Sequence, residues 1–174
     1  MEPAIADPGG TFTIQSASLE DFDLIWPILH DILAAGETYA WDEQTTCSEA
    51  QHFWMQTPLA TFVARSEPSG TVIGSYFLKP NQPGRGAHVA NAGYIVGRER
   101  RGQGIGRALC LHSLNEAKAR GFRAMQFNLV VSTNKHAVAL WESCGFRVVG
   151  TIPQAFLHPT AGYVPALIMH QSLL

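Results

Sequence analysis

The sequence is poor in charged residues and has no long apolar run, and both shortages exclude classes of protein. Asp, Glu, Lys and Arg make up 15% of the chain and the formal net charge is −2, whereas globular domains average about 25% charged residues. A nucleic-acid-binding protein needs a broad cationic face, and a membrane-surface anchor needs a polybasic segment. No apolar run reaches the roughly 20 residues that span a bilayer. We therefore expect neither nucleic acid nor membrane as a partner.

Cysteine is also scarce, and the known metal-binding motifs are missing. Cys47, Cys110 and Cys144 are odd in number, lie far apart and form no CxxC pair, which predicts reduced thiols. The opening residues MEPAIADPGG lack the basic start and apolar centre of a signal peptide. The seven histidines show no HExxH or similar spacing. We expect a cytoplasmic protein without a metal site.

The chain does contain enough apolar residues for a packed core. It has 174 residues, of which 46% are hydrophobic, and such a composition favours one full-sized core over disorder. No internal repeat, low-complexity segment or long linker divides it. We predict a single domain over residues 1–174.

The spacing of apolar residues predicts a mixed α/β sheet. Its elements are expected as helices at 22–33, 48–56, 104–120 and 134–144, and strands at 11–14, 60–66, 71–78, 87–96, 124–131, 146–151 and 163–173. Ser18 and Asp21 form a capping pattern before the first helix. The two strands around the third helix are rich in buried-type residues. A parallel pair joined by a right-handed crossover is therefore expected there.

The segment VGRERRGQGIGRAL (96–109) concentrates four arginines and four glycines at a strand-to-helix turn. A helix N-terminus presents unpaired N–H groups and about half a positive charge, which attract phosphate. Glycine lets the backbone approach an anion, and arginine adds charge-assisted hydrogen bonds. The segment is therefore typical of a phosphate-binding turn, and the alternative is an ordinary glycine-rich turn with solvated arginines.

Two common phosphate motifs do not match this segment. A P-loop requires GxxxxGK[ST], and the segment contains no lysine. The dinucleotide fingerprint GxGxxG, started at Gly102, requires glycine where the chain has Arg107. No acidic residue follows about twenty residues later, where that fingerprint places one.

The turn instead resembles a signature of the GNAT superfamily of acyl-CoA N-acyltransferases. Arg101-x-x-Gly104-x-Gly106 is similar to R/Q-x-x-G-x-G/A, and residues 134–151 resemble the second element, N-x-x-A-x-x-L-Y-x-x-x-G-F. The resemblance extends from Thr11 to the C-terminal strand. It implies a central twisted sheet with splayed parallel strands flanked by helices. The implied activity is transfer of an acetyl group from acetyl-CoA to a primary amine.

The same resemblance implies where the cofactor would bind. Backbone groups of Ile95 and Val96 would hold the pantetheine arm of acetyl-CoA in the gap between the splayed strands. Asn134 would face the arm or a phosphate, would cap the helix that follows it, or would do both. The residues expected around the pyrophosphate are Arg101, Gly102, Gln103, Gly104, Ile105, Gly106 and Arg107.

Elementary chemistry defines what else such a site needs. An amine attacks a thioester only when neutral, and protonation of an amine with a pKa of about 10.4 adds about 4–5 kcal/mol to the barrier at pH 7. A base is therefore useful. The attack places negative charge on the thioester oxygen, and we expect the N–H of Val96, beside a bulge in its strand, to stabilise it. A thiol with a pKa of about 8.5 leaves readily.

The chain departs from the family pattern at both positions proposed for proton transfer. Trp141 replaces a tyrosine that many relatives have as a proposed general acid, and indole cannot donate such a proton. Trp141 then packs in the core or against pantetheine. Asn91 stands where many relatives have a glutamate, and its amide can orient a water but cannot act as a base.

Two other residues are candidate bases. His88 lies three residues before Asn91, and histidine exchanges protons near neutral pH, although a lone histidine is often structural. Glu37 lies in the loop GETYAWD, which forms part of the acceptor pocket in similar proteins. Glu37 would take a proton or pair with a cationic substrate, or would be a solvated loop charge.

Further polar and aromatic residues are candidates for binding the acceptor. Asn128 interrupts an apolar strand, and its amide either lines the acceptor cleft or ties neighbouring loops together. Aromatic side chains in loops often shape small-molecule pockets. Those expected in loops near the acceptor end, some of them core residues, are Tyr39, Trp41, Phe156, His158 and Tyr163.

Three functions stay open on the sequence. The first is N-acetylation of a small amine, because the GETYAWD loop and the HPTAGYVPALIMH ending resemble family members that act on amino-acid-like compounds. The second is acetylation of a protein or peptide, which would favour an open acidic groove. The third is a non-catalytic acyl-CoA sensor. Similar proteins are often homodimers, and no sequence feature here establishes one.

Overall fold

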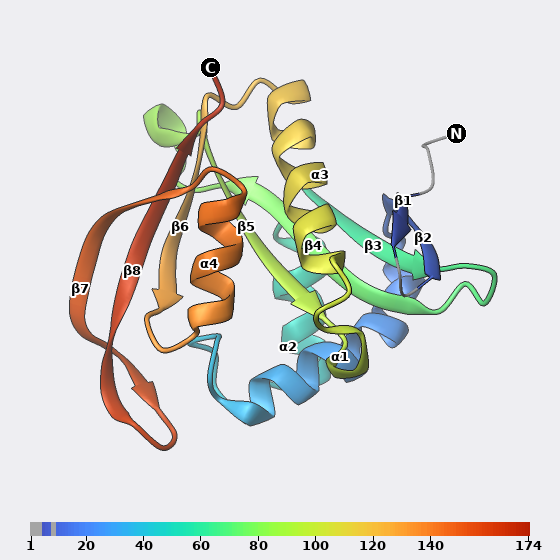
Figure 1. The fold of residues 1–174 in the computed structure, drawn as a ribbon, viewed down its shortest axis with the longest axis horizontal. Coiled ribbons are helices and arrows are strands. Elements are labelled where there is room, and N and C mark those ends of the chain that lie inside the picture. The colour runs from blue at the N-terminus through green and yellow to red at the C-terminus, as the bar shows by residue number, and fades with distance from the viewer. Residues whose placement is uncertain (1–4, 8–9) are drawn as a thin grey trace.

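A computed structural model describes residues 5–7 and 10–174, and a mixed eight-stranded sheet runs through them (Figure 1). The strand order is β1-β2-β3-β4-β5-β6-β8-β7. The bounds are β1 Ile5–Asp7, β2 Gly10–Ser16, β3 Ala60–Ser66, β4 Val72–Pro80, β5 Val89–Val96, β6 Ala124–Val131, β7 Arg147–His158 and β8 Gly162–Ser172. Neighbouring strands pair antiparallel except β5 and β6, which are parallel and flank α3 in sequence. The predicted α/β class and the parallel pair are thus confirmed.

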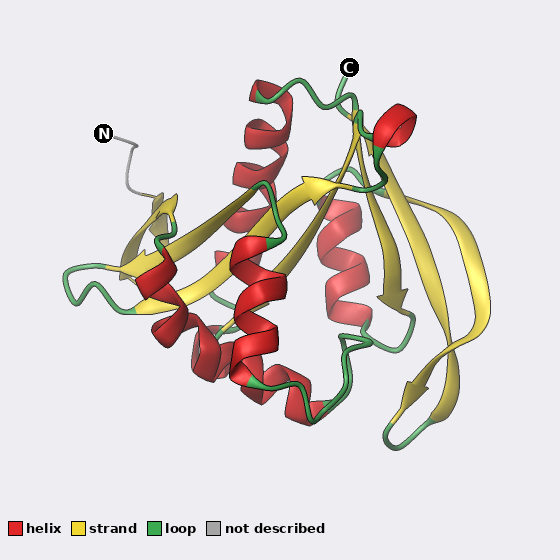
Figure 2. Cartoon of the chain, turned by 180° about the vertical axis from the view of Figure 1, so that it is seen from behind, coloured by secondary structure: helices red, strands yellow, loops and turns green. Residues whose placement is uncertain are grey.

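Helices cover both faces of the sheet (Figure 2). Their bounds are α1 Phe22–Ala35, α2 Cys47–Gln51, α3 Ile105–Ala119 and α4 Lys135–Ser143. On one face, α1 buries Phe22, Ile25, Leu29 and Leu33 at helical spacing, in a cluster with Trp54. The α3 and α4 helices cover the other face, where a second core cluster surrounds α3. The sheet therefore supports two separate apolar cores.

The first helix begins and ends at the signals that the sequence provides. The Ser18 N–H donates to Asp21 Oδ2 at 2.8 Å, which confirms the predicted capping pair. Pro27 lies inside α1. At the other end, Gly36 adopts φ +64° and its N–H donates to Leu33 O at 3.0 Å. The chain then leaves the helix as the loop that contains Glu37.

Several expected element ends differ from the structure, and two of these differences bear on the site. The strand predicted from residue 87 begins at Val89, because Gly84–Gly86 forms a short 3-10 turn before it. The strand predicted to end at residue 151 continues to His158, and β8 begins at Gly162. Phe156, His158 and Tyr163 therefore lie in a long hairpin and not in loops. Pro153 is tolerated because β7 is an edge strand with a register shift at that point.

The structure also bears on the expectations for the cysteines, for a metal site and for a membrane span. Cys47 is exposed, Cys110 and Cys144 are buried, and all three are free thiols. Among the described residues, no His, Cys, Asp and Glu side chains gather in a group that could hold a metal ion. No helix in the described part of the chain is long and apolar enough to cross a membrane.

The lack of a side chain at Gly93 lets two aromatic rings approach β5 closely. A methyl group at this position would lie 2.5 Å from Phe77 Cε1 and 3.0 Å from Tyr39 Oη. Tyr39 reaches across the strand and donates a hydrogen bond to Tyr94 O at 2.9 Å. Packing around Gly93 therefore fixes the loop after α1 against the middle of the sheet.

We predict that Gly93→Ala lowers the free energy of unfolding by about 1–3 kcal/mol, because the added methyl overpacks this contact. Gly97→Ala is the matched control, since its methyl group would lie 3.5 Å from the nearest atom, Ile73 O, at φ −54°. Urea unfolding curves of both variants measure the difference. Equal stability of the two variants would contradict the packing described for Gly93.

Candidate active site

The central feature of the site is the separation of β5 from β6. The two strands pair only at Val89–Ala124 and Ala90–Met125, whereas β5 stays paired with β4 as far as Val96. At the point of separation, Asn91 Nδ2 donates to Gln126 O at 2.8 Å. A side chain thus replaces the next ladder bond, and beyond it the two strands leave a gap.

The alternation of hydrogen bonds along β5 determines which backbone groups face this gap. Two hydrogen bonds join the ends of the β4–β5 pair, from Asn81 N to Val89 O (2.8 Å) and from Gly97 N to Ile73 O (2.9 Å). The register between these two bonds has no shift. Odd-numbered residues of β5 therefore pair with β4. The even-numbered residues direct their N–H and C=O groups toward the gap, and these are Ala92, Tyr94 and Val96.

Two expectations are corrected by this alternation. The backbone groups of Ile95 pair with Ser75 of β4 and do not face the gap, although Ile95 is among the residues that line the cavity. The bulge expected beside Val96 is missing from the described pairing of β4 and β5, because their register is continuous. The Val96 N–H still faces the gap, since regular alternation already places it there.

A cavity of about 1460 Å³ occupies the gap and its surroundings. Its walls come from the second halves of β5 and β6, the starts of α3 and α4, the loop after α1, and His158 at the end of β7. The splayed strands thus provide its floor, and loops that are distant in sequence provide its rim.

The glycine-rich turn forms one end of this cavity, which we call the glycine-turn end. Gly102 adopts φ +76° with no atom within 4 Å of where a Cβ would lie, and Gly104 caps α3 at φ +79°. The first-turn N–H groups of α3 have no partner within the helix. Arg100, Arg101 and Arg107 line the same wall. Open backbone, a helix N-terminus and three cations together suit a group with several phosphates.

Other predicted residues of this turn have structural contacts. Gln103 does not line the cavity, and its Nε2 donates to Glu99 O at 3.2 Å, which braces the turn. Gly106 lines the cavity, and a Cβ there would lie 3.2 Å from Leu140 Cδ2 of α4. Ile105 also lines it and is buried beneath.

Asn134 was expected to cap α4, to face the cofactor, or to do both, and its position allows both roles. Asn134 Oδ1 accepts the Ala137 N–H at 3.1 Å, so Asn134 is the N-cap. It also lines the cavity, beside Lys135 and His136. Sequence reasoning missed these last two residues, although they directly follow the cap of a helix that points its N-terminus at the site.

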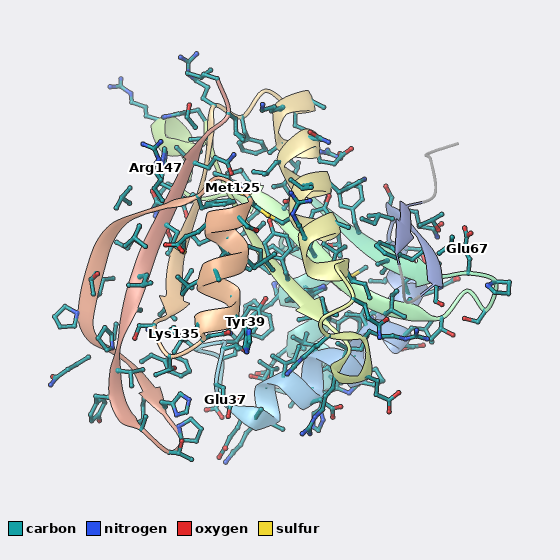
Figure 3. All side chains as sticks on the ribbon, viewed as in Figure 1. Glu37, Tyr39, Glu67, Met125, Lys135 and Arg147 are labelled. Atoms are coloured by element: carbon teal, nitrogen blue, oxygen red, sulfur yellow. The ribbon has the colours of Figure 1, made fainter. Side chains whose placement is uncertain are left out.

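The loop after α1 provides the opposite end of the cavity, which we call the acceptor end. Among the described residues that line the cavity, Glu37 is the only carboxylate. Thr38 Oγ1 is buried there and has no hydrogen-bond partner among the described residues. Burial raises the pKa of Tyr39 above its ordinary value, so this hydroxyl stays protonated. Glu37 and Tyr39 line the same cavity as Lys135, which Figure 3 labels where α4 begins.

Besides Gln103, four predicted residues lie outside the cavity lining. His88 is exposed and its Nδ1 lies 3.1 Å from Arg85 O. Asn91 holds the branch point described above. Asn128 donates to Asn81 Oδ1 at 2.6 Å, and so ties neighbouring segments together, which was the second of its two expected roles. Tyr163 is 69% exposed on β8.

Trp141 has a packing role that its sequence position only partly indicated. Its ring centroid lies 4.9 Å from that of Tyr94 and 5.1 Å from that of Phe127. Trp141 also lines the cavity. The indole therefore belongs to both the core and the wall that an arm in the gap would contact.

Comparison with known proteins agrees with this geometry. Residues 26–146 match the Acetyltransferase (GNAT) family. The N-acetyltransferase aca1 of Schizosaccharomyces pombe is 34% identical over 148 residues, which are 76% of this chain and 71% of that protein. A GCN5-related N-acetyltransferase from Kribbella flavida has a TM-score of 0.88 and 48% identity, over 92% of this chain and 97% of that one.

The fold also occurs in a more distant enzyme. A phosphinothricin acetyltransferase from Sinorhizobium meliloti, solved in complex with acetyl-CoA, has a TM-score of 0.82 and 22% identity, over 92% of this chain and 88% of that one. The family match spans well over half of the chain and includes both the glycine-rich turn and the segment of α4. The chain therefore belongs to the acetyltransferase (GNAT) family and is an N-acetyltransferase that uses acetyl-CoA.

Proposed function

We propose that this enzyme acetylates the primary amine of a small molecule such as an amino acid or an analogue of one, within one domain of residues 1–174. The observation that carries the proposal is the close approach of two segments at the acceptor end. A methyl group on Gly36 would lie 3.8 Å from Pro159 Cγ, so the end of α1 lies close to the turn between β7 and β8. A peptide acceptor would need a groove that passes between these segments.

The glycine-turn end fits acetyl-CoA through the residues that it presents. The N–H groups from Arg101 to Arg107 and the side chains of Arg100, Arg101 and Arg107 would hold its phosphates. Asn134 would direct its amide toward the arm or a phosphate. Bound there, acetyl-CoA supplies an acetyl thioester whose carbonyl carbon accepts the amine.

The gap-facing edge of β5 would position and polarise the thioester. The N–H groups of Ala92, Tyr94 and Val96 point into the gap, and Tyr94 O already accepts the Tyr39 hydroxyl. We assign the Val96 N–H to the acetyl oxygen as the candidate donor, because it is one of the β5 groups that face the gap. A fixed N–H donor that faces developing negative charge is worth about 3–4 kcal/mol in comparable sites.

Glu37 is the residue that would remove the proton from the acceptor amine. It is the only carboxylate among the described lining residues, whereas His88 and Asn91 lie outside the lining. Tyr39 cannot replace it, because its hydroxyl stays protonated and donates to Tyr94 O. Trp141 offers no acid for the leaving thiol, and a thiol of ordinary pKa leaves without one.

A panel of small amines tests the proposed function directly. We expect thiol release from acetyl-CoA that depends on the amine, with free amino acids or their analogues turned over faster than lysine-containing peptides. A thiol-reactive dye measures the release, and mass spectrometry identifies the acetylated product. Turnover restricted to peptides would contradict a small-molecule acceptor.

Removal of one arginine tests the phosphate-binding turn. Arg101→Ala is expected to weaken acetyl-CoA binding roughly 10- to 100-fold, because a hydrogen bond to a charged group contributes about 1.5–3 kcal/mol. The loss should shrink at high salt. Titration calorimetry measures it, with Arg85→Ala as the control because Arg85 is exposed and outside the cavity. An equal loss in both variants would argue for general electrostatic attraction.

Neutralising Glu37 tests its assignment as the base. Glu37→Gln is expected to lower kcat roughly 100-fold or more at neutral pH, since general bases contribute about 10²–10⁴-fold. Acetyl-CoA affinity should not change, because Glu37 lies at the acceptor end. Glu43→Gln is the matched control, because Glu43 is exposed in the same loop and does not line the cavity. Unchanged kcat in Glu37→Gln would remove this residue from proton transfer.

A further inference from the structure

Among the described residues of the β7–β8 hairpin, His158 is the one that lines the cavity. It ends β7, opposite Gly162, and the turn Pro159–Ala161 follows it. The same turn lies close to the loop that carries Glu37, because a methyl group on Gly36 would be 3.8 Å from Pro159 Cγ. His158 and Glu37 therefore belong to two segments that meet at the acceptor end.

The turn fixes the tautomer of the His158 ring. Its Nδ1 lies 3.3 Å from the backbone nitrogens of Thr160 and Ala161 and 3.3 Å from Thr160 Oγ1. Backbone N–H groups can only donate, so Nδ1 is the acceptor and carries no proton in the neutral ring. The proton of the neutral ring then resides on Nε2. No acceptor for Nε2 is found in the described part of the chain.

This arrangement makes His158 a hydrogen-bond donor. The ring is anchored through Nδ1, so Nε2–H is the ring donor that is left for a bound ligand. The neutral ring and the protonated ring both donate from Nε2. An acceptor group on the substrate satisfies this N–H, and a carboxylate does so with a charge-assisted bond.

We propose that His158 is a specificity-determining residue that binds the carboxylate of an amino-acid acceptor while Glu37 receives its amine. The proposal rests on the proposed function and adds the substrate class. A zwitterionic amino acid carries an ammonium and a carboxylate. The Glu37 carboxylate complements the ammonium, and the His158 N–H, on a neighbouring segment, complements the carboxylate. The unpartnered Thr38 hydroxyl beside Glu37 supplies a further polar group at this end.

Lys135 is the competing partner for the carboxylate. It lines the same cavity as Glu37 and Tyr39, from the start of α4 (Figure 3). The arginines lie at the glycine-turn end, where the phosphates of acetyl-CoA would engage them. An experiment must therefore separate His158 from Lys135.

The test compares three L-amino acids, leucine, methionine and phenylalanine, each with its own α-amide. The amide keeps the amine and the side chain but lacks the carboxylate. His158→Phe keeps a planar ring without the N–H, and His158→Gln restores an N–H donor. We expect His158→Phe to lower kcat/KM roughly 10- to 100-fold for the acids, mainly through KM, and less than about 3-fold for the amides. His158→Gln should recover most of the loss. The variant-to-native ratio for each acceptor cancels the different amine basicity of acid and amide.

Binding provides a readout that does not depend on turnover. With saturating CoA present, calorimetry should show that native enzyme binds leucine more tightly than leucinamide and that His158→Phe loses this preference. The proposal would be overturned if His158→Phe lowered kcat/KM equally for acids and amides. It would also be overturned if Lys135→Gln, but not His158→Phe, lost the preference for binding leucine over leucinamide. Acetylation of both acceptors by native enzyme without a preference would overturn it while leaving the proposed function intact. Failure of native enzyme to bind or acetylate any of these acceptors would overturn the role of His158, and the amine panel described above would then decide the proposed function separately.

Discussion

The site depends on one constraint, which is that β5 leaves β6 while it stays paired with β4. Unpaired backbone groups inside a sheet are costly, so a gap of this kind persists only if other groups satisfy them. Asn91 supplies the bond at the branch point, and the Tyr39 hydroxyl satisfies Tyr94 O. The remaining gap-facing groups of β5 are left for a ligand with amide and carbonyl groups of its own, and the pantetheine arm of acetyl-CoA has both.

Local chemistry made the glycine-rich turn predictable. Gly102 and Gly104 adopt positive φ, and α3 begins directly after them, so the residues that bend the backbone are the same ones that the motif contains. The capping residue Asn134 was equally accessible, because it acts on an N–H three residues away. Features determined within a few residues of the chain were therefore found from the pattern alone, together with the α/β class.

The roles that depend on distant strands could not be found in that way. A motif alignment places Asn91 at a position where relatives have glutamate, but its partner is a carbonyl of Gln126 on another strand. Whether the backbone groups of Ile95 or those of Val96 face the gap depends on which residues of β5 form hydrogen bonds with β4. The sequence does not show this. His158 and Tyr163 were both expected in loops near the acceptor end, and they lie instead on a long hairpin in which His158 lines the cavity and Tyr163 is exposed.

A short chain of contacts connects the two chemical functions of the site. Tyr39 is bonded to Tyr94 O, and the absence of a side chain at Gly93 allows that approach. Glu37 lies two residues before Tyr39, and Val96 lies two residues after Tyr94. The hydrogen bond between Tyr39 and Tyr94 therefore helps to fix the position of the candidate base relative to the candidate oxyanion donor. Preorganised groups stabilise a transition state because they do not have to reorient during the reaction. The cores on both faces of the sheet therefore stabilise the fold and also fix the relative position of the residues that would perform the chemistry.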